Sequence, residues 1–191
     1  MTTSNPSQQH TQSNHWLKSY YATRAAFSVA WVAAAFTIGR DSPMAASVLL
    51  AVYPLWDALA NLVDAQKNGG YRNNPTQTFN TVVSIITAIA VLAALQVSMH
   101  AVLGVFGVWA SLSGLLQLAT AIRRRKSNGA QWAMILSGAQ STLAGASFIY
   151  KAVSPTAMPS VTDIAPYAAF GAFYFLVSAA HLAITGYRAR K

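Results

Sequence analysis

A long apolar run that ends in four consecutive cations constrains this chain more than any other feature. The run begins at Phe106, reads FGVWASLSGLLQLATAI, and meets the cluster Arg123, Arg124, Arg125 and Lys126. A surface helix of a soluble protein keeps one polar face for water, whereas this segment is apolar on every face. An apolar helix that stops at a basic cluster is typical of a membrane span that reaches the cytoplasmic surface. We therefore interpret this segment as a transmembrane helix.

The composition agrees with a membrane protein. The chain has 191 residues, of which 54% are hydrophobic and only 9% are charged, whereas soluble domains are roughly 25% charged. Thirteen Lys and Arg against four acidic residues give a net charge of +9. The cations flank apolar runs and form no basic module, so we predict no nucleic-acid partner. The chain has no cysteine, which excludes disulfides, thiolate chemistry and Cys-ligated metals.

Six segments are long and apolar enough to cross a bilayer. A helix needs about 20 apolar residues to cross a hydrocarbon core roughly 30 Å thick. The candidate spans cover residues 20–38, 44–65, 80–97, 101–122, 131–151 and 162–187. We predict an all-α polytopic membrane protein with a six-helix transmembrane domain over 20–187. The polar segment 1–19 is expected to be a disordered cytoplasmic tail, and 188–191 a basic cytoplasmic tail.

The basic residues are divided unevenly between the two sides of the predicted domain. The side that carries both termini has eleven of them: Lys18, Arg24, Lys67, Arg72, Arg123, Arg124, Arg125, Lys126, Arg188, Arg190 and Lys191. The other side has Arg40 and Lys151. The positive-inside rule then places both termini in the cytoplasm. An odd number of spans would remove this asymmetry, so the asymmetry also supports six.

The six spans form three predicted hairpins, each with its short turn facing out, and the hairpins resemble one another. YPLWDALANLVD, around Trp56, aligns with FGVWASLSGLLQ, around Trp109. In the three hairpins the positions of Asp64, Gln117 and His181 correspond. This is a weak internal repeat of about 55–65 residues, and repeated units in membrane proteins often pack around a pseudosymmetry axis.

The fourth and fifth spans carry a recognisable pattern. G-x-W-x-x-x-S-G-L-L-Q-L over 107–118 is followed by W-x-x-I-L-S-G-x-x-S-x-x-x-G over 132–145, with Pro155 beyond it. This pattern resembles the HdeD-like acid-resistance membrane proteins, a family of short repeats of unknown function. The resemblance implies a bacterial inner-membrane protein built from two-helix hairpins, with a role in stress or acid tolerance. It implies no catalytic residues.

Polar residues gather on one face of the second span. Tyr53, Asp57, Asn61 and Asp64 are spaced by four, four and three residues, which places them on the same side of a helix. An aspartate inside a span costs at least a few kcal/mol and marks a candidate functional site. Arg24 is expected at the depth of 57–61, so we predict that it pairs with Asp57 or Asp64. A structural ion pair is the favoured interpretation over a proton or cation relay, and Asp64 is alternatively solvated near the interface.

Two polar residues occupy positions equivalent to Asp64. If the hairpins pack around one axis, Gln117 and His181 gather with Asp64 near the cytoplasmic end and line a polar path. A histidine titrates near neutral pH, which would suit an acid sensor. A lone histidine in a span is more often a packing residue, and both interpretations stay open at this stage.

Small residues mark a helix-packing face. Ser137, Gly138, Ser141 and Gly145 are spaced by three and four residues in the fifth span, and Gly114 interrupts the fourth. Small residues at this spacing allow helix backbones to approach closely. We predict a packing contact within the subunit or between subunits, which makes a homo-oligomer possible.

The basic cluster 123–126 is expected to fix the topology. It is also expected to attract anionic lipid headgroups, at about 1 kcal/mol per cation.

No enzyme motif is present. The sequence contains no Gly-x-Ser-x-Gly elbow, no His-Glu-x-x-His and no phosphate-binding loop. We predict a non-enzymatic protein without cofactor or metal, whose partner is the lipid bilayer and whose role is stress or acid tolerance. The alternative is a small transporter or channel with a polar path lined by Asp57, Gln117 and His181. An Asp57 sealed against Arg24 favours the first hypothesis, and an Asp57 that faces a cavity favours the second.

Overall fold

The computed structural model describes residues 6–125 and 131–188. Over these residues the chain is helical, without a strand, which confirms the predicted all-α class. The helices are α1 (Pro6–Ala34), α2 (Pro43–Lys67), α3 (Pro75–Ala94), α4 (Met99–Arg124), α5 (Gln131–Val153) and α6 (Ala165–Arg188). A π-helical turn, Ala35–Gly39, extends α1, and short 3₁₀ turns lie at Tyr71–Asn73 and Val161–Asp163.

Local sequence signals set the helix starts at the short turns. Pro43 occupies the first turn of α2, where its fixed φ suits a helix and its missing N–H is not needed. The hydroxyls of Ser42 and Ser98 cap α2 and α4 by accepting the backbone N–H of Ala45 (3.2 Å) and Ala101 (3.1 Å). These caps fix the residues at which α2 and α4 begin, so the connections Gly39–Pro43 and Gln96–His100 are short.

The start of α1 differs from the prediction for residues 1–19. The helix begins at Pro6, so residues 6–19 are helical instead of forming a disordered tail. Leu17 and Tyr21 are buried in a cluster with residues of α6, including Phe175. These apolar side chains pack the first turns of α1 against α6. The polar composition of the surrounding residues did not predict this contact. Of the tail predicted over 188–191, Arg188 ends α6 and the remainder lies outside the described residues.

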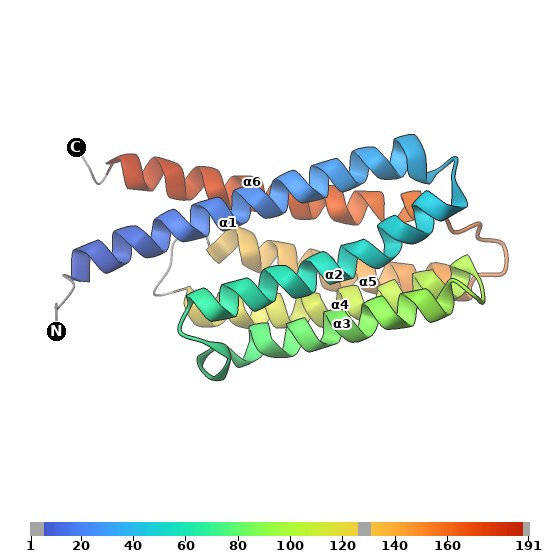
Figure 1. The fold of residues 1–191 in the computed structure, drawn as a ribbon, viewed down its shortest axis with the longest axis horizontal. Coiled ribbons are helices and arrows are strands. Elements are labelled where there is room, and N and C mark those ends of the chain that lie inside the picture. Colours follow the sequence, from blue (N-terminus) through green and yellow to red (C-terminus); the bar gives the residue numbers. More distant parts are fainter. Residues whose placement is uncertain (1–5, 126–130, 189–191) are drawn as a thin grey trace.

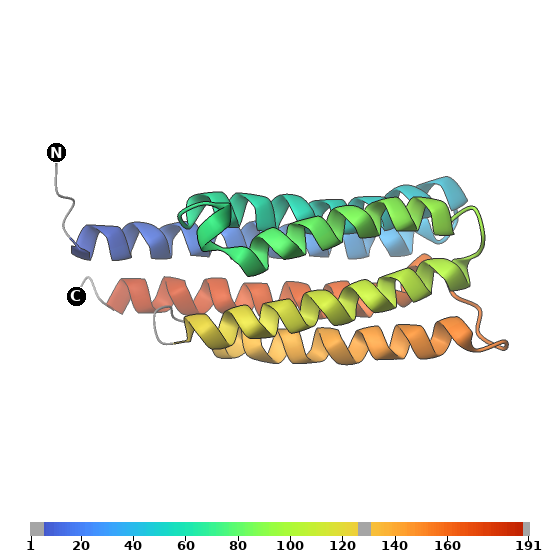
Figure 2. The ribbon, with the colours of Figure 1, turned by 90° about the horizontal axis from the view of Figure 1, so that it is seen from below.

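The helices run up and down between two ends (Figures 1 and 2). At one end lie the start of α1, the α2–α3 connection, the end of α4 and the end of α6. This end carries Lys67, Arg72 and the cluster 123–125, and we call it the basic end. The opposite end holds the α1–α2, α3–α4 and α5–α6 connections, and we call it the distal end.

The tightest helix pairs differ from the predicted hairpins. The most extensive contacts join α4 to α5, α1 to α6 and α2 to α3. Helices α1 and α2, like α5 and α6, are in contact over a short stretch only. The short turns at the distal end place consecutive helices next to each other at that end. The size of the side chains between two helices decides over how much of their length they remain in contact.

Glycines explain the α4–α5 contact. A Cβ atom added at Gly114 would lie 2.7 Å from the carbonyl oxygen of Gly138, and one added at Gly138 would lie 2.8 Å from that of Gly114. Gly107 and Gly145 form a second contact of the same kind one heptad away. The backbones therefore touch at two points, as small-residue packing requires. The packing face predicted at Gly114, Gly138 and Gly145 is a contact within the subunit.

Most of the helices have the length and apolarity of membrane spans. Within the described residues five helical segments qualify: Trp16–Gly39, Pro43–Lys67, Pro75–Ala94, Met99–Arg124 and Val161–Gly186. The remaining helix, α5, has 23 residues, about 35 Å, but Gln140 and several Ser residues lower its hydropathy. Large apolar side chains such as Ile89 (64% exposed) and Leu143 (72% exposed) face outward. Apolar surface of this extent is covered by a membrane or a partner, so the fold is that of an integral membrane protein.

An aromatic layer crosses the middle of the bundle. The rings of Tyr53, Trp109 and Tyr167 contact one another, with centroids 5.8 to 6.2 Å apart. Phe106 packs edge-on against Trp109, and Phe148 against Tyr167. These edge-to-face contacts are favourable between aromatic rings. The layer belongs to the large buried core, which continues toward the distal end.

Candidate functional site

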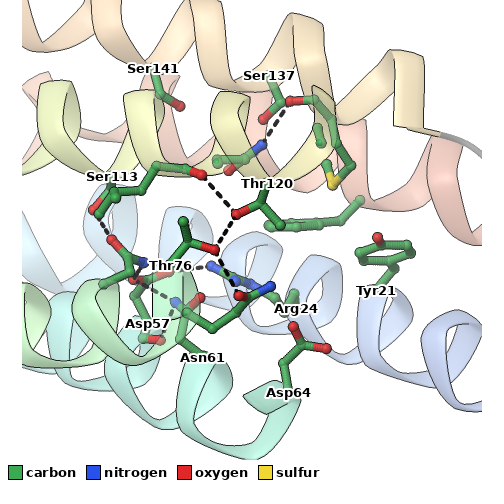
Figure 3. Close-up of a pocket in the computed structure, with 18 of the residues that line it drawn as sticks. Tyr21, Arg24, Asp57, Asn61, Asp64, Thr76, Ser113, Thr120, Ser137 and Ser141 are labelled. Atoms are coloured by element: carbon green, nitrogen blue, oxygen red, sulfur yellow. Dashed lines mark hydrogen bonds and ion pairs between the residues drawn. The ribbon is translucent and has the colours of Figure 1, made fainter. Parts of the chain in front are cut away.

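A polar cavity enters the bundle from the basic end (Figure 3). Its mouth is formed by Thr76 and Gln77 of α3 and by Thr120 and Arg124 of α4, and its floor is the aromatic layer. Its volume, measured as the space open to the centres of water molecules, is about 110 Å³. One water needs roughly 10–15 Å³ on this measure, so the cavity has room for several waters or one small solute. The lining of the cavity thus extends from the basic end to the middle of the bundle.

Asp57 lies in the wall of this cavity and accepts hydrogen bonds from four side chains. Its Oδ1 accepts from Arg24 of α1, which confirms the predicted ion pair. Its Oδ2 accepts from Asn61 (3.0 Å) on the next turn of α2 and from Asn80 and Ser84 of α3, both at 2.9 Å. The carboxylate is therefore held by groups from three helices.

Helix α4 supports this arrangement from behind. Trp109 Nε1 donates to the Ser84 hydroxyl (2.9 Å), and the Ser113 hydroxyl donates to Asn80 Oδ1 (2.9 Å). Each group that binds Oδ2 from α3 is thus oriented by a residue of α4. The side chain of Asp57 is only 11% exposed, and fixed donors occupy both of its oxygens.

Arg24 has partners on three sides. Besides Asp57, its guanidinium donates to the Tyr20 hydroxyl (3.1 Å) and lies 4.5 Å from the ring centre of Phe175. The ring face attracts the cation. Among the described residues, the Nε of Arg24 and the Nε1 of Trp56 are buried without a hydrogen-bond partner. Both residues line the cavity, and buried donors of this kind require an acceptor.

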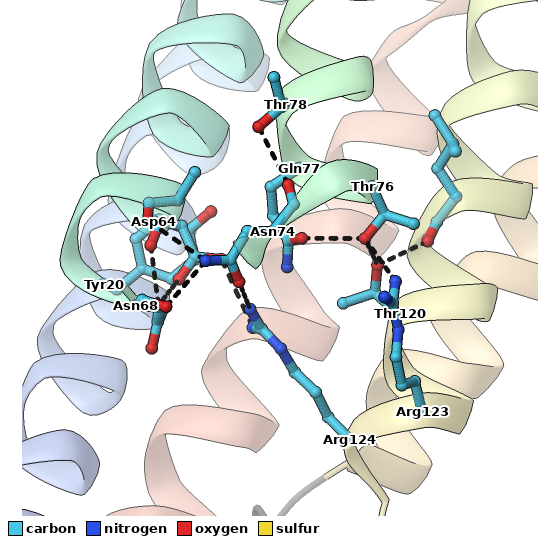
Figure 4. A network of polar contacts seen from close by, with 12 residues as sticks. Tyr20, Asp64, Asn68, Asn74, Thr76, Gln77, Thr78, Thr120, Arg123 and Arg124 are labelled. Carbon is cyan, nitrogen blue, oxygen red and sulfur yellow. Dashed lines mark hydrogen bonds and ion pairs between the residues drawn. The ribbon is translucent and has the colours of Figure 1, made fainter. Parts of the chain in front are cut away.

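Asp64 forms a second ion pair at the mouth (Figure 4). It is 4% exposed, which corrects the interpretation that it is solvated. Its Oδ2 lies 3.4 Å from Arg124 Nη1, and its Oδ1 accepts from Asn68 (2.7 Å). Arg124 also donates to Asn74 (3.2 Å) in the α2–α3 connection. The end of α4 is thereby tied to the end of α2 and to the loop that follows it.

The basic cluster is divided between two environments. Arg124 points inward onto Asp64, and its side chain is only 20% exposed; its contact with anionic lipid stays a prediction. Arg123 donates to Thr76 (2.9 Å) at the rim, and Arg125 is exposed. Lys126 lies outside the described residues. The pairing of Arg124 could not be read from a run of four equivalent cations.

Gln117 and His181 differ in their relation to the cavity. Gln117 lines it with Asp64, and its side-chain amide donates to the Met134 carbonyl (3.2 Å). His181 is not among the lining residues. It follows Phe175, which does line the cavity, by six residues, so it lies about 120° around α6. The predicted grouping of three polar residues therefore holds for two of them, and the proposed path is not lined by His181.

The serines of α5 turn away from α4. Ser137 and Ser141 line the cavity, whereas Gly138 and Gly145 face α4.

The sequence also contained a signal for α3 that the prediction missed. Its polar residues recur at helical spacing and form one buried stripe: Gln77, Asn80, Thr81, Ser84 and Thr87. Such a stripe in an otherwise apolar span indicates a face turned to polar partners.

Residues 79–150 match the model of a family described as a short repeat of unknown function (DUF308). No curated protein and no solved structure matches the chain. The matched part covers most of α3, all of α4 and most of α5. It thus contains Asn80, Ser84 and Trp109, while Arg24 and Asp57 lie before it. Over this part of the chain the match supports the predicted resemblance to a family of short repeats of unknown function.

Proposed function

We propose that the chain is a six-span membrane protein that binds and moves a small uncharged polar solute through the cavity. The observation that carries the proposal is a polar cavity that opens at the basic end and stops at the aromatic layer. Transporters commonly bind their substrates near the bilayer midplane, in sites reached from one side at a time. A polar cavity that extends from the basic end to mid-depth fits that arrangement.

The charges in the wall favour an uncharged solute. Among the described residues, two cations and two anions line the cavity, and they are paired as Arg24 with Asp57 and Arg124 with Asp64. The positive and negative charges of this wall therefore balance, and they give the cavity no net charge to attract an ion. The buried N–H groups of Arg24 and Trp56 instead suit a carbonyl or hydroxyl acceptor.

The Asp57 contacts argue against a proton relay through this residue. A relay group must exchange a proton with water or with a neighbouring group, whereas both oxygens of Asp57 are already occupied by hydrogen bonds from fixed side chains. We assign Asp57 and Arg24 the role of fixing four helices around the cavity. The proposed role involves no bond-making chemistry and no cofactor.

The proposed setting is the inner membrane of a bacterium, with both termini and the cavity mouth in the cytoplasm. The eleven-to-two division of cations supports this orientation. The resemblance of 107–145 to HdeD-like proteins supports a physiological role in acid or stress tolerance. Survival of a bacterial host that lacks the gene, after acid exposure with and without the restored wild type, tests that role. Unchanged survival would contradict it without bearing on solute passage.

Solute flux through liposomes tests the cavity directly. Light scattering would follow the entry of urea and of glycerol into proteoliposomes after a concentration jump. Leu116 lines the cavity, and its neighbour Leu115 is 51% exposed on the outer face. We expect the wild type and Leu115→Trp to exceed empty liposomes and Leu116→Trp to lose the excess. Entry equal to empty liposomes for all proteins and both solutes would refute the proposal.

Cysteine labelling tests the position of the mouth. The native chain has no cysteine, so single substitutions give a clean readout with a membrane-impermeant methanethiosulfonate. Ser113 lies about 16 Å along α4 from Arg124 and lines the cavity. Ala133 lies only about 3 Å along α5 from Gln131 but is fully buried outside it. We expect Ser113→Cys to react from the basic side and Ala133→Cys to stay unlabelled; the reverse order would show that depth alone controls access.

A further inference from the structure

A second hollow lies on the outside of the bundle, between α5 and α6. Its volume on the measure used above is about 510 Å³, larger than that of the central cavity. The hollow exists because α5 packs along α4 and α6 packs along α1, which leaves α5 and α6 sparsely in contact. We call it the α5–α6 groove. It opens toward the outer surface that the exposed apolar side chains define.

The groove changes in character along its length. At the distal end Lys151 pairs with Asp163, and the Lys151 side chain remains 44% exposed. The middle is mostly apolar, with Ala144 and Phe148 on α5 and Phe170 on α6, and Ser147 is the polar residue between the first two. Lys151 lies about 30 Å along α5 from its start, which is the level of a bilayer surface. An exposed lysine–aspartate pair at the surface followed by a mostly apolar trough matches a zwitterionic phospholipid, with its headgroup at the pair and an acyl chain below.

The inner end of the groove adjoins the central cavity. Ser137, Ser141, Tyr167 and Gly171 line both spaces. At Gly171 an added Cβ atom would meet no atom within 4 Å, in contrast to the backbone contacts at Gly114. Interior positions of folded proteins are close-packed, and unfilled space costs dispersion contacts. In a bilayer, lipid acyl chains surround the protein at this position and can fill the opening.

We propose that the α5–α6 groove binds one phospholipid from the leaflet at the distal end. Its headgroup lies beside Lys151, and one acyl chain passes Phe148 and Phe170 and ends at Gly171. The proposal rests on the proposed six-span arrangement, because α5 must lie in the bilayer. It does not depend on which solute the cavity takes.

Photocrosslinking in vesicles tests this site. The full chain would be reconstituted in phosphatidylcholine that contains increasing fractions of a phosphatidylcholine with a diazirine in one acyl chain, and labelled peptides would be located by mass spectrometry. We expect labelling along the groove to saturate at a low probe fraction. Labelling at Ile86 and Ile89 on the outward face of α3, 60% and 64% exposed, should rise in proportion to the probe.

Two glycines of α6 provide a matched pair of variants. Gly171 lines the groove, whereas Gly186 does not, and neither has an atom within 4 Å of an added Cβ. Leucine at either position removes a helix glycine, and the gain in helix propensity is smaller at Gly186, which lies in the last turn of α6. We expect Gly171→Leu to lower groove labelling at least about threefold, because its side chain occupies the chain terminus, and Gly186→Leu to leave it unchanged.

The outcomes that overturn the proposal are distinct from a failure of solute flux. Groove labelling that rises linearly with the probe would show ordinary lipid contact without a site. Groove labelling that is unaffected by a folded Gly171→Leu would remove the assigned chain position. A groove that stays unlabelled while a second copy of the chain crosslinks to Lys151 would make it a dimer contact. If Gly171→Leu does not fold, saturation in the wild type decides the question.

Discussion

Replacing Asp57 by asparagine tests the central structural argument of this fold. The amide has nearly the shape of the carboxylate, but it carries no charge and replaces one acceptor oxygen with a donor. If the oxygen of the new amide accepts from Asn61, Asn80 and Ser84, its nitrogen faces the guanidinium of Arg24. If the amide is reversed, the nitrogen faces the amide donors of Asn61 and Asn80. No orientation satisfies every donor, and in both the buried cation loses its counter-ion.

The size of the effect follows from the burial of the pair. The side chains of Arg24 and Asp57 are 16% and 11% exposed, so water screens them poorly. Removing one partner of a buried ion pair costs about 3–5 kcal/mol, because an uncompensated charge remains. The Arg40–Asp41 pair in the α1–α2 turn is 64% and 76% exposed, and exposed pairs contribute about 0–1 kcal/mol. Asp41→Asn is therefore the matched control.

The free energy of unfolding would be measured in detergent micelles by titration with a denaturing surfactant, followed by tryptophan fluorescence. We expect Asp57→Asn to lower it by about 3–5 kcal/mol and Asp41→Asn by less than about 1 kcal/mol. Adding Arg24→Met to Asp57→Asn removes the unpaired cation and should recover about 1–3 kcal/mol relative to the sum of the single changes.

Two outcomes would refute the reasoning. An Asp57→Asn variant as stable as Asp41→Asn would mean that the carboxylate does not hold the helices together. Strict additivity of Arg24→Met and Asp57→Asn would mean that the two side chains do not interact. In either case the four-helix network would have no energetic role, and Asp57 would again be a candidate relay residue.

Two further predictions use the same unfolding assay. Gly114→Ala should destabilise the protein by about 1–3 kcal/mol, because its methyl group meets the backbone of Gly138 at 2.7 Å. Gly186→Ala, in open space, should be neutral or stabilising by up to about 1 kcal/mol; equal effects at both glycines would contradict the tight α4–α5 contact. Arg124→Gln should cost about 1–3 kcal/mol by leaving a buried carboxylate with weaker partners, whereas the exposed Arg125→Gln should stay within about 0.5 kcal/mol. Indistinguishable Arg124 and Arg125 variants would show that the ion pair at the mouth is not formed.

Much of the fold could be predicted because hydropathy acts on one segment at a time. The apolar runs and the short capped turns placed the helices within a few residues, except at the start of α1. That start depends on Leu17 and Tyr21 packing against Phe175, more than 150 positions away in the sequence. The polar residues of the tail gave no sign of this contact. The helix-pairing pattern was also hidden, since Gly138 could equally have faced a neighbouring subunit.

The candidate site was predicted in part. Asp57 and Arg24 were found together because a charge inside a span is costly and a short hairpin fixes relative depth. Asn80, Ser84 and Trp109 were not found, because each polar group alone is unremarkable in a helix. Their shared role appears only when α3 and α4 are brought against α2. His181 was misplaced by the repeat, which matches depth in the membrane but not rotation about the helix axis.

The sequence by itself determined that this protein lies in a membrane. It also determined the approximate ends of the helices and the depth of the charged residues in that membrane. These properties follow from transfer energies and chain length, which are local sums over neighbouring residues. Tertiary structure decided which cation each aspartate pairs with, which faces of α5 meet α4 and which meet the cavity, and where space is left unfilled. These properties depend on the rotation and spacing of helices, which side chains distant in the sequence fix jointly.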